Sequence, residues 1–253
     1  MKIEPHEATQ FDLAAADQME KIISDLGRMY HERNEALQEV ARAHHEALFL
    51  LAVAADYKDN DTSVHIVRIG FLAEALALRL GQSKAYALLL RKAAPMHDIG
   101  KIGIPDNVLK KPGGLTPEER QVMNQHAAIG ADILGKSRIA LFKLAAEVAL
   151  THHERWDGTG YPRGLAGAGI PLSGRIVSVV DFYDALTMDR VYRPALGQDE
   201  ALAMLQEQTG KAFDPAIVDC FMRHQGELHD LRKRITQSPM NFSDLVESSP
   251  ADL

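Results

Sequence analysis

The sequence is poor in cysteine, in long apolar runs and in positive charge, and each shortage excludes a class of protein. Cys220 is the single cysteine, which excludes an internal disulfide framework and fits a reducing compartment. No apolar run is long enough to span a bilayer, and the first ten residues are charged rather than signal-like. The net charge of -7 argues against DNA binding through a broad basic surface. We therefore expect a cytoplasmic protein that contacts neither membrane nor DNA.

Proline is also missing between Asp12 and Asp56, where Gly27 is the single glycine. Apolar or small residues recur there with heptad spacing, at Met19, Ile22, Leu26, Met29, Ala36, Val40, Ala43, Ala47 and Leu50. This pattern predicts one long helix with a continuous seam. Because the seam is rich in alanine and broken by Arg33, two arrangements stay open: a dimeric coiled coil, and a helix packed on its own domain.

The rest of the chain shows helical periodicity and no strand pattern, so we predict an all-α fold. We expect a dimerisation or signalling helix at 1–55, a main domain at 56–230 and a flexible tail at 231–253. The expected helices of the main domain are 62–80, 83–98, a helix beginning after Thr116, 139–151, 173–186, 199–209 and 214–228. Residues 103–114 read as an irregular connection, and the glycine-rich segment 156–174 reads as a long ordered loop.

Histidine and aspartate side chains recur on the inward faces or at the ends of different predicted helices. They are His65, His97, Asp98, His126, His152, His153 and Asp181. Each one alone is compatible with a structural role, but their combination favours a metal site. Imidazole with carboxylate suits Fe, Mn, Zn or Ni. The set exceeds what one ion needs, so we predict two divalent ions with Asp98 as the bridge.

A two-metal site is the usual arrangement for in-line displacement at phosphorus, with a metal-bridging hydroxide as the nucleophile. Phosphoester hydrolysis is therefore the leading reaction class. Lys101 follows His97 by four residues, so a persisting helical turn would direct it toward a phosphate oxygen or the leaving group. Adjacent residues of a helix diverge by about 100°, so His152 and His153 reach one ion only if their helix ends there.

The segments HDIGKIGIP and HHERWDGTGYPRGL, followed by VVDFYDALTMDRVYRPAL, resemble the HD-GYP family of the HD phosphohydrolase superfamily, which hydrolyses cyclic di-GMP. The resemblance runs from about Asp56 to Leu228 and implies an HD-domain helical bundle. It implies the same metal ligands, with Fe or Mn as the ions. It also implies catalytic roles for Asp98 and Lys101, and phosphate contacts for Lys101, Arg190 and Arg193.

Two departures from the family pattern stand out. Asp61 occupies a position where some members place a glutamate that helps to hold a third metal, so a third ion stays open here. Val191 replaces the usual proline after Arg190, which predicts a differently posed phosphate clamp. In the loop Gly160-Tyr161-Pro162, the tyrosine would either lie under a guanine or pin the loop. The resemblance also implies that this loop recruits GGDEF-domain proteins.

The expected activity is hydrolysis of cyclic di-GMP to linear pGpG, and further hydrolysis to GMP stays open. One alternative is a phosphodiesterase for another cyclic dinucleotide, such as 3′3′-cyclic GMP-AMP. Another is a nucleotide-sensing module without turnover, and a third is a single-metal nucleotide hydrolase. The long N-terminal helix would make a homodimer or receive a signal from a partner.

Overall fold

The computed structural model describes residues 5–59, 63–189 and 194–237. Asp61, Arg190, Val191 and Arg193 lie outside these ranges. The chain divides into two compact units, residues 1–46 and 47–253. Within the described ranges the regular structure is helical, with one isolated bridge between Thr209 and Phe213. The prediction of an all-α fold is confirmed.

Helix α1 spans Pro5–Asp59, so the predicted long helix is confirmed. In the first unit its apolar seam is exposed to solvent: Met19 is 60%, Leu26 59% and Met29 62% exposed. In the second unit the last turns of α1 enter the core, where Ala52 and Ala55 are buried. The last turns of the helix therefore pack on their own domain, whereas a dimeric coiled coil through the exposed seam stays a prediction.

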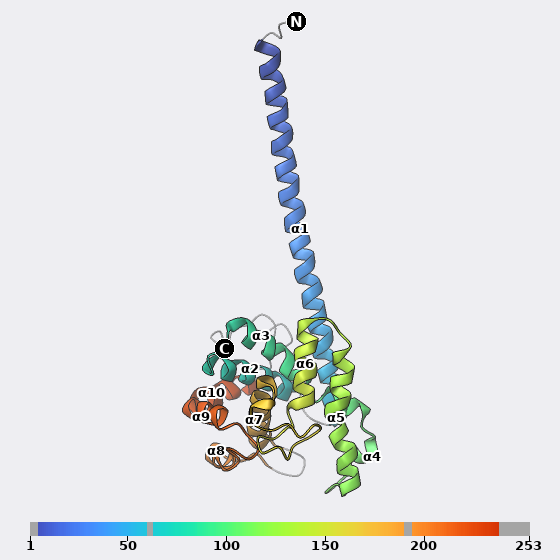
Figure 1. The fold of residues 1–253 in the computed structure, drawn as a ribbon, viewed down its shortest axis with the longest axis vertical. Coiled ribbons are helices and arrows are strands. Elements are labelled where there is room, and N and C mark those ends of the chain that lie inside the picture. Colours follow the sequence, from blue (N-terminus) through green and yellow to red (C-terminus); the bar gives the residue numbers. More distant parts are fainter. Residues whose placement is uncertain (1–4, 60–62, 190–193, 238–253) are drawn as a thin grey trace. The chain divides into compact units, whose positions relative to one another are not determined.

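The second unit is a bundle of helices around α2 (Figure 1). α2 (Ser63–Arg79) is buried from His65 to Ala77 and packs against α3, α7 and α10. The other helices are α3 (Lys84–Ala93), α4 (Asp106–Leu109), α5 (Pro117–Gly135), α6 (Ala140–Thr151), α7 (Leu172–Leu186), α8 (Gln198–Glu207), α9 (Pro215–Arg223), α10 (Gln225–Gln237) and the 3-10 helices η1 (Ala94–Met96), η2 (Ile99–Gly103) and η3 (Gly167–Gly169). A helix buried on all sides must pair its polar groups internally.

The predicted third helix does not run unbroken into His97-Asp98. α3 ends at Ala93, and two 3-10 helices follow it. Pro95 has no backbone N–H and its ring opposes a continuous α-helix, which accounts for the change. His97 therefore closes η1 while Asp98 precedes η2. At this junction Asp98 has φ -102° and ψ 8°, so the backbone leaves the helical conformation between the two short helices.

Two other helix ends position the site. Thr116 and Glu119 form a reciprocal capping box at the start of α5, as predicted, and this fixes the helix that carries His126. α6 ends at Thr151, and His152 is its C-cap residue. The condition for His152 and His153 to face the same point is therefore met.

Three segments differ from their predicted structure. The predicted helix 214–228 is divided at His224 into α9 and α10. The connection 103–114 contains the short helix α4. The predicted tail boundary at residue 231 falls inside α10, where Leu231, Arg232 and Ile235 are buried because one face of that helix packs on α2. Residues 238–253 lie outside the described ranges. Among the described helices, none is both long enough and apolar enough to cross a bilayer.

Candidate metal centre

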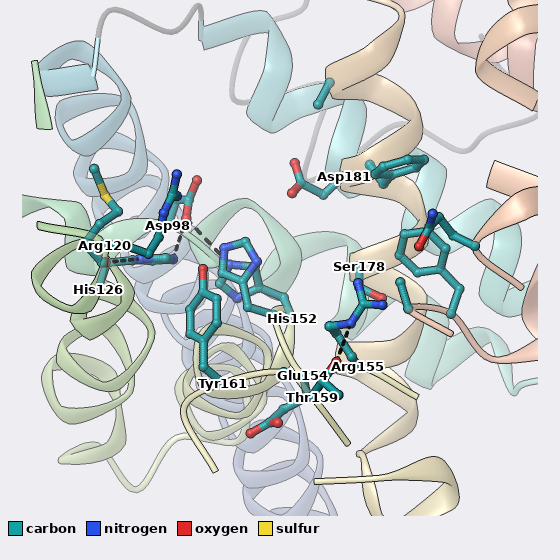
Figure 2. A pocket seen from close by; sticks show the side chains of 18 of the residues that line it. Asp98, Arg120, His126, His152, Glu154, Arg155, Thr159, Tyr161, Ser178 and Asp181 are labelled. Atoms are coloured by element: carbon teal, nitrogen blue, oxygen red, sulfur yellow. Dashed lines mark hydrogen bonds and ion pairs between the residues drawn. The ribbon is translucent and has the colours of Figure 1, made fainter. Parts of the chain in front are cut away.

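The predicted ligands come together in the bundle in two groups. Figure 2 labels four of them, Asp98, His126, His152 and Asp181. In each group, the potential ligand atoms lie within 4.8 Å of one another. The first group is Asp98, His126, His152 and His153, and the second is His65, His97 and Asp181. Segments far apart in the sequence supply these side chains: α2, the junction before η2, α5, the end of α6, and α7. Each group has the ligand types of a divalent metal site.

Asp98 lies between the two groups. Its Oδ1 is 3.2 Å from Nε2 of His126 and 3.6 Å from Nε2 of His152. Its Oδ2 is 3.3 Å from Nε2 of His97, which belongs to the other group. In the second group, Asp181 Oδ1 is 3.5 Å from His65 Nε2 and 3.8 Å from His97 Nε2. One carboxylate therefore faces both groups, as a bridging ligand would.

The histidine rings are held by their other nitrogen. Three Nδ1 atoms face backbone carbonyl oxygens: His97 to Ala94 at 3.1 Å, His126 to Met123 at 2.8 Å and His152 to Ala149 at 3.0 Å. A carbonyl can only accept, so Nδ1 carries the proton and Nε2 presents a lone pair. A ring held in this way is oriented for metal binding.

Several of these lone pairs are buried without a partner. Nε2 of His126, Nε2 of His152 and Oδ1 of Asp98 make no hydrogen bond with the described residues. An unsatisfied buried acceptor is costly, and buried polar atoms in proteins are normally paired. Because these acceptors converge from different helices, they fit divalent metal ions.

Electrostatics favours the protonation states that metal binding needs in Asp98, His152 and His153. Burial alone would raise the pKa of Asp98, but Lys101, whose Nζ lies 2.8 Å from Oδ2, and the nearby histidines hold that pKa well below its usual range. Burial lowers the pKa of His152, and burial together with the nearby rings of His152 and His126 lowers the pKa of His153 further. The carboxylate is thus ionised and these imidazoles neutral at neutral pH.

A second buried carboxylate supports the centre from behind. Asp184 accepts hydrogen bonds from Arg68 Nε at 2.7 Å, Arg68 Nη2 at 2.8 Å and Arg232 Nε at 2.9 Å. It also faces the ring of His65. The sequence analysis gave Asp184 no role. Two features of the sequence could have indicated this role. Asp184 follows the candidate ligand Asp181 by three residues, and Arg68 follows His65 by three residues.

The glycine-rich loop after His153 is held by Glu154, a residue that the sequence prediction left unassigned. This buried carboxylate accepts from the backbone N–H groups of Arg163 at 2.8 Å and Leu165 at 2.9 Å. Tyr161 stacks on His153, with ring centroids 4.8 Å apart at an interplanar angle of 27°. The ring of Tyr161 therefore lies against the candidate metal ligand His153. This contact matches the alternative in which the tyrosine pins the loop. Stacking on a guanine remains a prediction.

Both ligand groups open into one cavity of about 760 Å³. Figure 2 shows Arg120 and His126 on one side of it, Asp181 and Ser178 on another, and Tyr161 between them. Lys101 and Arg120 add positive charge to the lining. This volume lies within the range of small-molecule sites, and the charge suits an anionic ligand. Arg190, Arg193 and Asp61 were also predicted here, but they lie outside the described residues.

Known proteins resemble this chain in sequence. Residues 35–217 match the family model described as HD domain. A cyclic di-GMP phosphodiesterase of Thermotoga maritima is 44% identical over 209 residues, which cover 82% of this chain and 57% of that protein. The 3′3′-cGAMP-specific phosphodiesterase 2 of Vibrio cholerae is 37% identical over 187 residues, covering 74% of this chain and 36% of that protein. The chain thus spans about half the length, or less, of these curated relatives.

A solved structure shares the fold. The crystal structure of a cyclic GMP-AMP specific phosphodiesterase of Vibrio cholerae, V-cGAP3, aligns with a TM-score of 0.56 at 19% identity. The alignment covers 80% of this chain and 57% of that chain. At this level of identity the likeness concerns the helical architecture alone.

Proposed function

Because this chain belongs to the HD-domain family, we propose that it is a metal-dependent phosphodiesterase that hydrolyses cyclic di-GMP to linear pGpG and then to GMP. One observation carries the proposal: Asp98 faces two groups of buried ligand atoms with one oxygen toward each. The Thermotoga maritima relative, named for cyclic di-GMP, supports this choice of substrate.

We assign each ligand group to one divalent ion. His126, His152 and His153 would hold one ion, His65, His97 and Asp181 the other, and Asp98 would touch both. The mixture of imidazole and carboxylate suits Fe or Mn. When bound, such ions supply a water of lowered pKa and positive charge opposite the phosphoryl oxygens. A third ion at Asp61 belongs to the same proposal.

The remaining roles fall to cationic side chains. Lys101 lines the cavity beside Asp98, so its ammonium would balance charge on a phosphate oxygen as the bond to the leaving 3′ oxygen breaks. Arg190 and Arg193 would hold the second phosphate. Tyr161 and Glu154 keep the glycine-rich loop against the ligands, which excludes bulk water from one side of the reacting phosphate.

A second candidate substrate is 3′3′-cyclic GMP-AMP, favoured by the likeness to the Vibrio cholerae relative named for that nucleotide. Lys101 and the two arginines act on phosphates, which both cyclic dinucleotides share. The choice between the substrates therefore depends on groups that contact the bases.

Substitution of the bridging carboxylate tests the proposal. We expect the wild type loaded anaerobically with Mn or Fe(II) to release pGpG, and Asp98→Ala to lose that turnover while its helical circular dichroism is retained. Asp132→Ala on the exposed face of α5 is the control, because Asp132 is paired with Lys136 at the surface. Unchanged turnover in Asp98→Ala would refute the proposal. Elemental analysis that finds one ion per chain would favour the single-metal alternative.

We also propose partners for this chain. The exposed apolar seam of α1 in the first unit suits a second copy of the same helix, which would make a parallel coiled-coil homodimer. The loop at Gly160-Tyr161-Pro162 is the proposed contact for GGDEF-domain proteins. The cytoplasm is the proposed location, since one buried cysteine fits a reducing compartment.

A further inference from the structure

Part of the cavity lining is apolar, and we call this part the lobe. α7, α8 and the turn after α8 build this lobe from Phe182, Met204 and Phe213, among others. The rings of Phe182 and Phe213 lie 5.0 Å apart between centroids at an angle of 56°. Aromatic and thioether side chains of this kind fit the flat face of a purine, whereas a phosphate would avoid them.

Two polar side chains border the lobe at the end of α8. These are Glu207 and Gln208, and neither side chain forms a hydrogen bond or ion pair with another described residue. Four carboxylates line the cavity: Asp98 and Asp181 are candidate metal ligands and Glu154 holds the glycine-rich loop, whereas Glu207 is exposed to solvent and free to meet a ligand. A carboxylate raises the energy of a bound anion unless it accepts hydrogen bonds from donors on that ligand.

The lobe is held in place by backbone hydrogen bonds. After α8 the chain turns tightly, and the Gln208 carbonyl accepts from Ala212 N at 3.0 Å. The same turn is joined to the glycine-rich loop, since Trp156 N donates to Ala212 O at 3.0 Å and Asp157 N donates to Lys211 O at 2.8 Å. The lobe is therefore fixed relative to the ligand-bearing end of α6, which is the condition for a specificity pocket.

We infer that this lobe is a guanine subsite and that Glu207 determines base specificity. Guanine presents N1–H and N2–H₂ on its Watson–Crick edge, two adjacent donors that match the two oxygens of one carboxylate. Adenine presents an unprotonated N1 at that edge, which a carboxylate repels. Gln208 lies beside Glu207 and can donate to the guanine O6. This inference rests on the proposed hydrolysis of cyclic dinucleotides.

The inference sets the substrate range. One guanine is sufficient to fill the lobe, so cyclic di-GMP and 3′3′-cyclic GMP-AMP should both be hydrolysed, while cyclic di-AMP should be a poor substrate. Cyclic di-IMP lacks the N2 amino group and should fall between these extremes, because it keeps N1–H alone.

The test is a comparison of kcat/KM for these substrates in the wild type and in Glu207→Gln. The amide keeps the shape of the side chain but removes the charge and one acceptor. We expect the preference for cyclic di-GMP over cyclic di-AMP to fall by about 10- to 100-fold, the effect of losing a charge-assisted hydrogen-bonded pair. Glu200→Gln is the matched control, since it makes the same change on the same helix outside the cavity lining.

The outcomes separate this inference from the proposed function. If the wild type hydrolyses cyclic di-GMP and Glu207→Gln keeps the wild-type preference, the guanine subsite is refuted and the phosphodiesterase proposal stands. Equal turnover of cyclic di-AMP and cyclic di-GMP by the wild type would also overturn the subsite. If no cyclic dinucleotide is hydrolysed or bound in calorimetry, both proposals fall.

Discussion

Nδ1 of His65 lies 2.7 Å from Oδ2 of Asp184, and both side chains are buried. This contact directs the opposite nitrogen of His65 toward Asp181. Burial alone would lower the pKa of His65, but the hydrogen bond and the charge of Asp184 raise it above its ordinary value. Asp184 thus acts as a positioning residue for a candidate ligand, in the manner of carboxylates behind metal-bound histidines.

Asp184→Asn should be strongly destabilising. The buried guanidinium groups of Arg68 and Arg232 would lose their charged partner, so the free energy of unfolding should fall by about 3 kcal/mol. Urea denaturation of the metal-free protein measures this change. Asp219→Asn removes an exposed aspartate paired with Arg223 and should cost less than about 0.5 kcal/mol. Similar losses in both variants would contradict the role given to Asp184.

Gly160→Ala should damage the glycine-rich loop. A Cβ at Gly160 would overlap the backbone of Arg155 and His153, which cannot move without shifting the loop against the ligands. We expect turnover to fall by about tenfold or more, since small misplacements of binding groups are costly. Gly169→Ala in the same loop is the control, because a Cβ there meets open space and its φ is not left-handed. Equal activities of the two variants would show that the close approach has no functional consequence.

Lys58→Met should loosen the turn that carries Asp98 and Lys101. Nζ of Lys58 donates to the carbonyl oxygens of Ile104 at 2.7 Å and Ile102 at 2.8 Å. Loss of these charge-assisted bonds should lower the free energy of unfolding by about 1.5 kcal/mol and reduce kcat more than it changes KM. Lys58→Arg should recover part of both effects.

A matched variant for Lys58→Met is Lys136→Met, which removes an exposed lysine paired with Asp132. It should leave stability and turnover near the wild-type values. If Lys58→Met behaves like this control, the contact with the η2 carbonyls is not what holds the turn.

The buried phenol of Tyr183 should make the free energy of unfolding fall at alkaline pH. Burial raises its pKa to about 12, and its hydroxyl lies 2.8 Å from Nδ1 of His229. Because the unfolded phenol ionises near pH 10, the stabilisation is complete below pH 10 and declines as pH rises toward 12, by about 2 kcal/mol. Urea unfolding across this window should show a steeper decline for the wild type than for Tyr183→Phe. Tyr57→Phe, an exposed site, should follow the wild type.

Leu26→Arg should dissociate the proposed homodimer. Leu26 lies on the apolar seam of α1, and a charged side chain there would face its copy across a parallel coiled coil. Light scattering after gel filtration should report a dimer for the wild type and a monomer for the variant. Gln38→Arg changes an exposed residue away from the seam and should stay dimeric. A monomeric wild type at micromolar concentration would contradict the proposal.

Much of the fold was predictable because it depends on neighbours in sequence. The proline-free stretch before Asp56 predicted α1, and the capping residues at Thr116 predicted the start of α5. The paired motifs predicted a member of the HD-GYP branch, which the HD domain match and the relatives named for cyclic di-GMP confirm. Local periodicity did not predict the break at Pro95, since the surrounding residues favour a helix.

The sequence alone determined which side chains are available for metal chemistry and the order in which helices deliver them. Tertiary structure decided how those side chains are grouped. The separation of His65, His97 and Asp181 from the group around His126 depends on how α2, α5, α6 and α7 pack, which no local pattern encodes. The central place of Asp98 depends on the junction between two 3-10 helices, where its backbone leaves the helical conformation, and on the helices that bring the other ligands to it.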